Sequence, residues 1–322
     1  MKKTVILILL LAIISQLFGC ATPKDDGRIN IVCTLFPQYD WVKNIVGDSK
    51  NITVSLLIQN GTDPHSYQPT ASDIMTLSSC DMVVLIGSDS DVWVQEALER
   101  AKNESTVKVA LSQIEGMTLH DVSASSHEHG HEQHEHEHST FDEHIWLSIS
   151  NAITATEYLT QEICALDSEN AQKYQENSTS YQKKLHELDN KYQSAVNSTD
   201  ISSRFILFAD RFPFVYLLED YKIEYAAAFE GCTTDVDADF NTVLELIKEA
   251  EEHRVRYVTV TEASNQELAY TVATSAKAKL EILVMNSLQS VNQKQLDEGI
   301  SYLSVMENNL SVLSKALSVK GE

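Results

Sequence analysis

Residues 167–198, DSENAQKYQENSTSYQKKLHELDNKYQSAVNS, are the stretch that decides the fold. Apolar, aromatic and small side chains recur in it every three or four positions, at Ala171, Tyr174, Ser178, Tyr181, Leu185, Leu188, Tyr192 and Val196. This spacing predicts the packing face of one long helix. Ser168 is the expected N-cap, and no Gly or Pro interrupts the run. We therefore expect a stiff helix that lies across two halves of the protein.

Strand-like segments lie on both sides of this helix. INIVCTLF, NITVSLLI, DMVVLIG and VKVALS come before it, and RFILFAD, IEYAAAF, RYVTVTE and LEILVMN come after it. Helix-like segments, such as 234–253 and 264–278, separate them. This alternation predicts an α/β fold of two parallel-sheet lobes joined by a single long rigid helix, with a ligand-binding cleft between the lobes. The expected boundaries are 29–147 for the N-terminal lobe, 148–198 for the helical connector and 199–322 for the C-terminal lobe.

The amino terminus predicts export and anchoring. Lys2 and Lys3 precede the apolar run TVILILLLAIISQLF, which is too short for a comfortable membrane span and is typical of a secretory signal. The run ends in LFGC, which resembles the cleavage box of bacterial lipoproteins. That resemblance implies a signal peptide over 1–19, a diacylglyceryl anchor on Cys20 and a tether over 20–28; the alternative is an ordinary signal peptide. We expect an extracytoplasmic protein, anchored by lipid to the outer face of the cell membrane.

Composition limits the partners. With 24 Lys+Arg and 47 Asp+Glu, the formal net charge is −23, which argues against nucleic acid or anionic lipid as partners and favours cations. After Cys20, the cysteines are too few and too scattered for a disulfide framework or a zinc ribbon. They are Cys33, Cys80, Cys164 and Cys232. A bridge between Cys33 and Cys80 is left open, and we expect a monomer.

Polar residues near the predicted carboxyl ends of the strands are the candidate ligands. His65 lies in the turn GTDPHSYQPTASDI after the second strand, and His144 lies beside Trp146 in FDEHIWLSISNAI. Three candidates in the second half each close a strand: Asp210, Glu262 and Asn286. Because ligands of open α/β sheets bind at the carboxyl ends of the strands, these side chains are expected to meet in the cleft. Two imidazoles and one or two carboxylates suit a divalent transition metal, zinc best among them.

Several of these segments carry a family resemblance. DPHSYQPTASDI, DEHIWLS, the uninterrupted helix and the His-rich insertion before DEHIWLS together resemble the metal-binding lipoproteins of zinc and manganese ABC importers, the cluster A-I type of solute-binding protein. CTLFPQYDWVKNIVGD and ADRFPFVYLLEDY extend the resemblance over nearly the whole mature chain. The resemblance implies two α/β lobes with a metal ion between them, His65 and His144 as ligands, and an ABC transporter permease as partner.

The second lobe departs from the pattern of that family. Arg211 stands five residues before Tyr216, where most zinc-binding members have a third histidine, and a guanidinium stays protonated and cannot bind a metal. At the end of the last strand, where the family has Asp or His, this chain has Asn286, a weak neutral oxygen donor. Glu262 is therefore the preferred carboxylate ligand, with Asp210 second and Asn286 third. Each is alternatively a salt-bridge or cap partner, and Arg211 is a candidate to pair with one of them.

The segment HEHGHEQHEHEH, residues 127–138, holds six of the eleven histidines. They are His127, His129, His131, His134, His136 and His138. HEHGH and HEHEH match the H-E-x-x-H pattern of zinc proteases, but that motif needs a stable helix. Gly130 and the glutamate-histidine repeat instead predict a disordered loop, within 120–140, that collects metal ions loosely. The tract is therefore expected to be accessory to the cleft site, and the protein is not expected to be an enzyme.

Two functions of different class fit these features. The first is an extracytoplasmic solute-binding lipoprotein that captures Zn²⁺ and delivers it to an ABC importer. Mn²⁺ is the alternative cargo, because it prefers more oxygen donors than zinc does. The second function is a surface adhesin with a structural metal site. The first is favoured because the candidate ligands converge on an interlobe cleft and the chain has no repeats or separate binding module.

Overall fold

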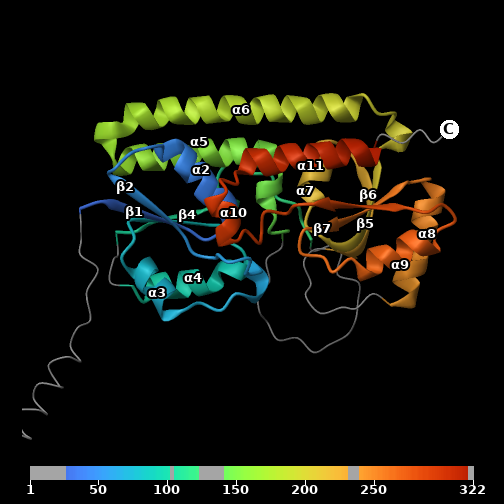
Figure 1. The fold of residues 1–322 in the computed structure, drawn as a ribbon. Coiled ribbons are helices and arrows are strands. Elements are labelled where there is room, and N and C mark those ends of the chain that lie inside the picture. The colour runs from blue at the N-terminus through green and yellow to red at the C-terminus, as the bar shows by residue number, and fades with distance from the viewer. Residues whose placement is uncertain (1–26, 102–104, 123–140, 231–238, 318–322) are drawn as a thin grey trace, which may run out of the picture.

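The computed structural model describes residues 27–101, 105–122, 141–230 and 239–317 (Figure 1). The predicted signal peptide, the predicted lipidation site Cys20 and the six histidines of the tract lie outside these residues. Within the described ranges, no helix combines the length and the apolar composition that a membrane span requires.

Two parallel four-stranded sheets form the framework. The first has the strand order β2-β1-β3-β4 and consists of β1 (Ile29–Cys33), β2 (Ile52–Leu56), β3 (Met82–Leu85) and β4 (Val107–Ala110). The second has the order β6-β5-β7-β8 and consists of β5 (Phe205–Phe212), β6 (Glu224–Glu230), β7 (Tyr257–Thr261) and β8 (Glu281–Met285). The eight predicted strands are all present, and the predicted fold of two parallel α/β lobes is confirmed.

Helices cover the sheets because the inner strands are apolar on both faces. All four residues of β3 are buried, as expected for an inner strand of a parallel sheet. In the first lobe, α3 (Ala71–Ser78) and α4 (Val92–Glu99) lie on one face, and α2 (Phe36–Val46) and α5 (Ile149–Leu166) on the other (Figure 1). In the second lobe, α7 (Val215–Asp220), α8 (Phe240–Glu252) and α9 (Glu267–Ser275) pack against the strands. Because helices cover both faces of the sheets, the polar residues of the site lie in the loops that follow the strands.

The long helix α6 (Ala171–Asn197) extends along both lobes, with α5 and α11 (Tyr302–Leu317) packed beneath it (Figure 1). Every residue of the predicted packing face except Ala171 is buried. The predicted N-cap is wrong, because Ser168–Asn170 form a 3-10 turn and the α-helix begins after Asn170. The Asp167 carboxylate accepts hydrogen bonds from Asn170 Nδ2 at 3.1 Å and from Tyr174 OH at 2.7 Å, which draws the chain into this tighter turn.

The lobes are connected a second time, which was not predicted from the sequence. After β8 the chain crosses to the N-terminal lobe through α10 (Gln293–Asp297), and α11 then returns along α6 (Figure 1). Gly61 N donates to Val291 O at 3.3 Å, and Tyr302 OH donates to Trp146 O at 2.8 Å. These bonds fix the crossing segment against the N-terminal lobe, so the loop after β8 lies between the two lobes.

Cys33 and Cys80, whose pairing was left open, are both buried, and neither is in a disulfide. Burial raises the pKa of Cys80 to about 12, so its thiol stays protonated at neutral pH. No disulfide therefore joins these two cysteines, and the N-terminal lobe is held together by its core.

A buried carboxyl, Asp40 of α2, lies where α6 and α11 meet the N-terminal lobe. Its Oδ2 accepts hydrogen bonds at 3.2 Å from Tyr181 OH and from Tyr302 N. Burial nevertheless raises the pKa of Asp40 from its ordinary 3.8 to about 6. The folded state therefore binds this proton more tightly than the unfolded state does. The resulting contribution to stability is present below about pH 4 and is lost as the pH rises through 6.

We expect Asp40→Asn to remove this pH dependence, because the amide stays neutral and its oxygen accepts the same bonds. As the pH rises from 4 to 7, the wild type should lose about 2 to 3 kcal/mol of unfolding free energy that the variant keeps. Urea denaturation at several pH values measures the difference. Asp297→Asn, made at an exposed aspartate, controls for the aspartate-to-asparagine change itself. Parallel stability curves for wild type and Asp40→Asn would contradict the expectation.

Candidate metal centre

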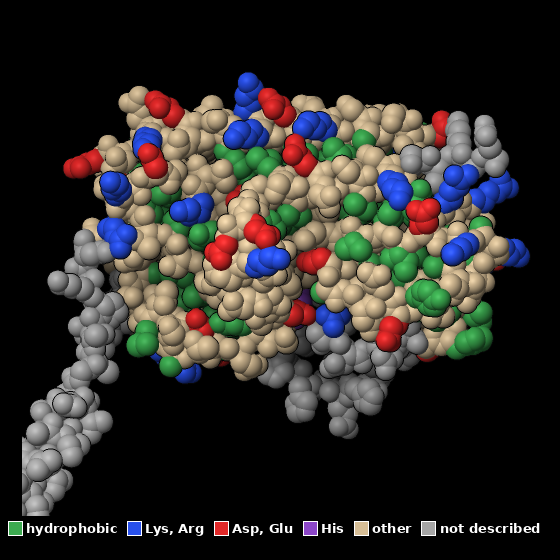
Figure 2. Space-filling model, in the orientation of Figure 1, with side chains coloured by type: hydrophobic (Ala, Val, Ile, Leu, Met, Phe, Trp, Pro, Cys, Tyr) green, Lys and Arg blue, Asp and Glu red, His purple; other side chains and the backbone are tan. Residues whose placement is uncertain are grey.

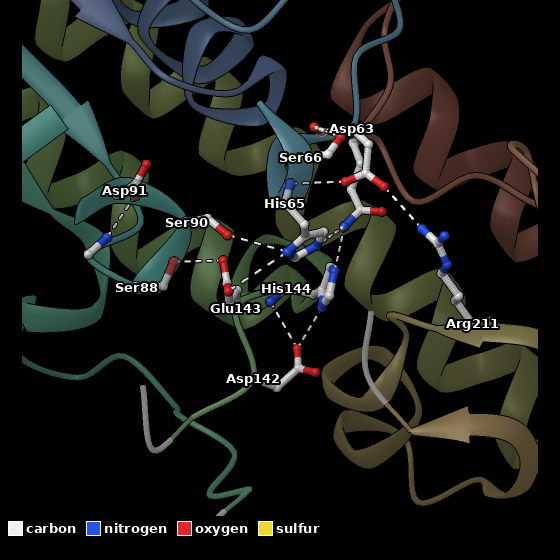
Figure 3. A network of polar contacts seen from close by, with 12 residues as sticks. Asp63, His65, Ser66, Ser88, Ser90, Asp91, Asp142, Glu143, His144 and Arg211 are labelled. Atoms are coloured by element: carbon white, nitrogen blue, oxygen red, sulfur yellow. Dashed lines mark hydrogen bonds and ion pairs between the residues drawn. The ribbon is translucent and has the colours of Figure 1, made fainter. Parts of the chain in front are cut away.

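Two of the predicted ligands, His65 and His144, lie side by side between the lobes. Their side chains are 15% and 2% exposed, and Figure 2 shows only a small area of histidine surface, in the furrow between the two halves. The ring centroids are 5.7 Å apart (Figure 3). His65 comes from the 3-10 turn Pro64–Ser66 after β2, and His144 precedes the 3-10 turn Ile145–Leu147 before α5. Shielding of the two rings from bulk water strengthens their attraction for a cation.

The backbone at His65 is fixed by Asp63. Asp63 Oδ1 accepts a hydrogen bond from His65 N at 3.0 Å, and Pro64 restricts φ at the first position of the turn. Asp63 Oδ2 forms an ion pair with Arg211 Nη1, also at 3.0 Å (Figure 3). Arg211 belongs to β5 of the second lobe, so one carboxylate connects the turn of His65 to that lobe. Arg211 therefore forms its ion pair with a residue that was not among the predicted partners.

The ring of His144 is oriented by Asp142. Asp142 Oδ1 accepts from His144 N at 2.9 Å and lies 2.8 Å from His144 Nδ1. Burial alone raises the pKa of Asp142, but the His144 ring and its hydrogen bonds outweigh burial, so the pKa is lowered. An ionised carboxylate at this distance keeps the hydrogen of the imidazole on Nδ1, which leaves the lone pair on Nε2. Tyr216 OH holds the same segment by donating to Asp142 O at 2.6 Å.

The Nδ1 side of His65 also faces oxygen atoms. Ser90 Oγ lies 3.3 Å from His65 Nδ1, and Glu143 Oε1 lies 3.9 Å from it (Figure 3). Ser88 Oγ donates to Glu143 Oε2 at 2.7 Å and fixes that carboxylate. Both acceptors favour a hydrogen on His65 Nδ1, so His65 also presents its Nε2 lone pair.

Gln289, which was not among the predicted ligands, reaches both rings. Its Nε2 lies 2.5 Å from His144 Nε2 and 3.2 Å from His65 Nε2. The two N–H groups of a primary amide suit the two lone pairs. Gln289 follows β8 by four residues, in the loop NSLQ that crosses between the lobes. The two ring nitrogens thus point to one place, which the second lobe reaches with a neutral polar group.

The predicted ligands of the second lobe form other bonds. Glu262 accepts from Ser287 N and from Ser287 Oγ, each at 2.8 Å, and burial raises its pKa. Asp210 Oδ2 accepts from Thr261 N at 2.9 Å and from Thr261 Oγ1 at 2.5 Å. Asn286 Oδ1 accepts from the backbone two residues further on, at 2.8 Å. Within the described part of the chain, no group of three or more His, Cys, Asp or Glu side chains is arranged to hold a metal ion. Among the predicted ligands that the structure describes, His65 and His144 are the pair brought together between the lobes, and the choice of ligand in the second lobe stays a prediction.

Comparison with known proteins gives a consistent result. Residues 31–316 match the family model described as the zinc-uptake complex component A, periplasmic. The chain is 31% identical over 326 residues to the zinc-binding lipoprotein AdcA of Streptococcus pneumoniae, and the matched region covers 97% of this chain and 61% of AdcA. It is 32% identical over 302 residues to the high-affinity zinc uptake system protein ZnuA of Bacillus subtilis, covering 94% and 91% respectively. The chain thus spans about three fifths of the streptococcal relative and most of the Bacillus one.

Solved structures show the same fold. The Zn(II)-bound ZnuA-like domain of Streptococcus pneumoniae AdcA matches with a TM-score of 0.73 and 26% identity, over 91% of this chain and 100% of that one. The metal-dependent lipoprotein YcdH from Bacillus subtilis matches over the same shares with a TM-score of 0.74 and 26% identity. Since the family model spans both lobes and the segment that connects them, the chain belongs to the family of zinc-uptake complex component A proteins.

Proposed function

We propose that this protein is an extracytoplasmic solute-binding lipoprotein that captures Zn²⁺ and delivers it to the permease of an ABC importer. The observation that carries the proposal is the convergence of His65 Nε2 and His144 Nε2 on one place between the lobes. The family, and the zinc-binding names of the AdcA and ZnuA relatives, support zinc as the cargo. The family is one of transport solute-binding proteins, which agrees with the expectation that the protein is not an enzyme.

The proposed ligand set combines both lobes. His65 Nε2 and His144 Nε2 supply two nitrogen donors, and the Gln289 side chain supplies an oxygen once its amide turns over. The last torsion of glutamine is broad and nearly two-fold, so the rotation that exchanges Nε2 and Oε1 meets little torsional resistance. Two nitrogens, one oxygen and a water molecule complete the four-coordinate geometry that zinc prefers. Glu262 and Asp210 remain outside this set because both are engaged by neighbouring hydroxyl and N–H groups.

The lipid anchor is part of the same proposal. The sequence LFGC ends the apolar amino-terminal run, and the relative AdcA is named a lipoprotein. An acyl chain on Cys20 would hold the metal-binding body near the membrane in which the permease lies.

Calorimetric titration with Zn²⁺ and with Mn²⁺, together with metal analysis of the purified protein, tests the function. We expect one tight zinc ion per molecule and weaker binding of manganese, because imidazole nitrogen favours zinc. Tighter binding of Mn²⁺ than of Zn²⁺ would make manganese the cargo. Absence of tight binding for both metals would refute the proposal.

The tract 127–138 is expected to supply weak extra sites and no part of the tight one. Replacing its six histidines with serine preserves the loop length and should leave one tight zinc ion, while the weaker ions disappear and capture at low zinc slows. The reason is compositional: a glutamate-histidine repeat predicts no fixed arrangement of its rings, so binding an ion there costs conformational entropy. Calorimetry and stopped-flow zinc uptake measure the two effects. Loss of the tight phase in this variant would show that the tract is the site.

A further inference from the structure

We infer that Glu262 is a positioning residue for the metal: through Ser287 it turns the amide oxygen of Gln289 toward the ion. This inference rests on the proposed function and names how the second lobe takes part in the site. It assigns to the predicted ligand Glu262 a role that acts through another residue.

Glu262 and Ser287 form a closed pair of bonds between β7 and the loop after β8. Ser287 N donates to Glu262 Oε2, and Ser287 Oγ donates to Glu262 Oε1, each at 2.8 Å. Ser287 is only 2% exposed, so water does not compete for these bonds. Both carboxylate oxygens are thus bonded to one residue, which fixes its backbone and the direction of its hydroxyl.

The hydroxyl of Ser287 has one hydrogen and two acceptors within reach. Its Oγ lies 2.8 Å from Glu262 Oε1 and 3.2 Å from Gln289 Oε1. The carboxylate is nearer and is the stronger acceptor, so it takes the hydrogen. Ser287 Oγ then offers Gln289 only lone pairs, which suit the N–H side of the amide. Glu262 therefore favours the orientation with Nε2 toward Ser287 and Oε1 toward the histidines.

The histidine pair favours the opposite orientation until a cation arrives. The lone pairs of His65 Nε2 and His144 Nε2 attract the N–H groups of Gln289, as the short contacts show. A cation between the rings repels those N–H groups and attracts the amide oxygen. Ser287 Oγ can accept the N–H group that rotates away from the ion. Rotation of the Gln289 amide therefore leaves that N–H group hydrogen-bonded. Glu262 thus lowers the cost of converting the loop to its metal-binding form.

The same serine connects the loop to His144. Trp146 Nε1 donates to Ser287 O at 2.9 Å, and the Trp146 ring lies edge-on to the His144 ring with centroids 5.2 Å apart. The position of Ser287 therefore relates Gln289 to the turn that carries His144. A fixed Ser287 therefore keeps the side chains of Gln289 and His144 in a constant position relative to each other.

A double-mutant cycle on Zn²⁺ affinity, measured by competition with a chelator, tests the inference. In Glu262→Gln the introduced amide can donate to Ser287 Oγ, which sends the hydroxyl hydrogen to Gln289 Oε1 and holds that oxygen away from the ion. We expect Glu262→Gln to weaken zinc binding about tenfold in the wild type. In the Gln289→Ala background there is no amide to orient, so the same change should alter affinity by less than about twofold. Ser287→Ala should show the same dependence on Gln289 and provides a second route if Glu262→Gln does not fold.

Asp239 provides a matched control at the N-terminus of α8, because its carboxylate likewise accepts from the N–H and the hydroxyl of one residue, Thr242, at 2.8 and 3.0 Å. Asp239→Asn should bind zinc as the wild type does. An equal loss from Glu262→Gln with and without Gln289 would overturn the inference and make Glu262 a ligand or a purely structural residue. Cobalt spectra would then separate those two cases, since only loss of a ligand changes the bands at saturation. Failure of the wild type to bind zinc would instead refute the proposed function.

Discussion

The His144→Ala variant should bind zinc about a hundredfold or more weakly than the wild type, with the His-rich tract still present. The substitution removes one of about four donors, and it removes the donor that is best held. The His144 side chain is 2% exposed, and Asp142 fixes both its backbone N–H and its Nδ1. A ligand that is positioned before the metal arrives loses little entropy on binding, so its removal costs nearly its full contribution.

Titration calorimetry of His144→Ala and of the serine-substituted tract compares the two groups of histidines directly. His186 is exposed on α6 and gives a control, since His186→Ala should keep the tight ion. Thermal unfolding of the metal-free variants checks that each one is folded. Retention of the tight ion by His144→Ala would exclude His144 as a ligand and leave the interlobe site without its main donor.

Acidification should weaken zinc binding on the order of 600-fold between pH 7 and pH 5. Free imidazole titrates near pH 6.5, and only the neutral ring offers a lone pair to a metal. The proposed site needs two neutral rings at once, so the effects of the two protonations multiply. A site with a single imidazole would lose only about 25-fold over the same range. Since one protonation changes the affinity at most tenfold per pH unit, a loss of more than about 100-fold between pH 7 and pH 5 requires that more than one group is protonated.

Chelator competition at each pH, corrected for protonation of the chelator, gives the affinity, and circular dichroism confirms that the protein remains folded at pH 5. The His65→Ala variant, although weak, should show the shallower dependence of a single ring. A wild-type affinity that does not change with pH would exclude a histidine site altogether.

Local patterns were sufficient to predict the framework. The spacing of Tyr174, Tyr181 and Tyr192 identified the buried face of α6, because helical periodicity depends only on neighbours along the chain. Runs such as DMVVLIG identified inner strands for the same reason. The prediction of Ser168 as the N-cap was wrong because hydrogen bonds to Asp167 stabilise a 3-10 turn over the same residues. The preference of serine for the N-cap position is weaker than this local interaction.

The second lobe's share of the site was harder to predict because it depends on contacts between distant residues. Gln289 lies 145 residues from His144 in sequence and reaches it only because the chain crosses back between the lobes. The signal was a polar side chain in the loop after a predicted strand, beyond the strand end itself. Glu262 ends its strand as a ligand would, yet Ser287 bonds both of its oxygens. A local pattern shows that a carboxylate ends a strand, but it does not show which partners the two oxygens will contact.

The double connection between the lobes bears on how fast zinc can leave. Opening by rotation of one whole lobe would have to rearrange both α6 and the crossing segment 286–301, together with bonds such as that from Tyr302 OH to Trp146 O. Movement confined to the loop around Gln289 leaves α6 and the bond from Tyr302 OH to Trp146 O in place. Loop motions take nanoseconds to microseconds, whereas hinge motions of whole domains take microseconds to milliseconds. We therefore expect the dissociation rate to follow substitutions in this short loop and to be insensitive to solvent viscosity, which slows large rigid-body rotations most.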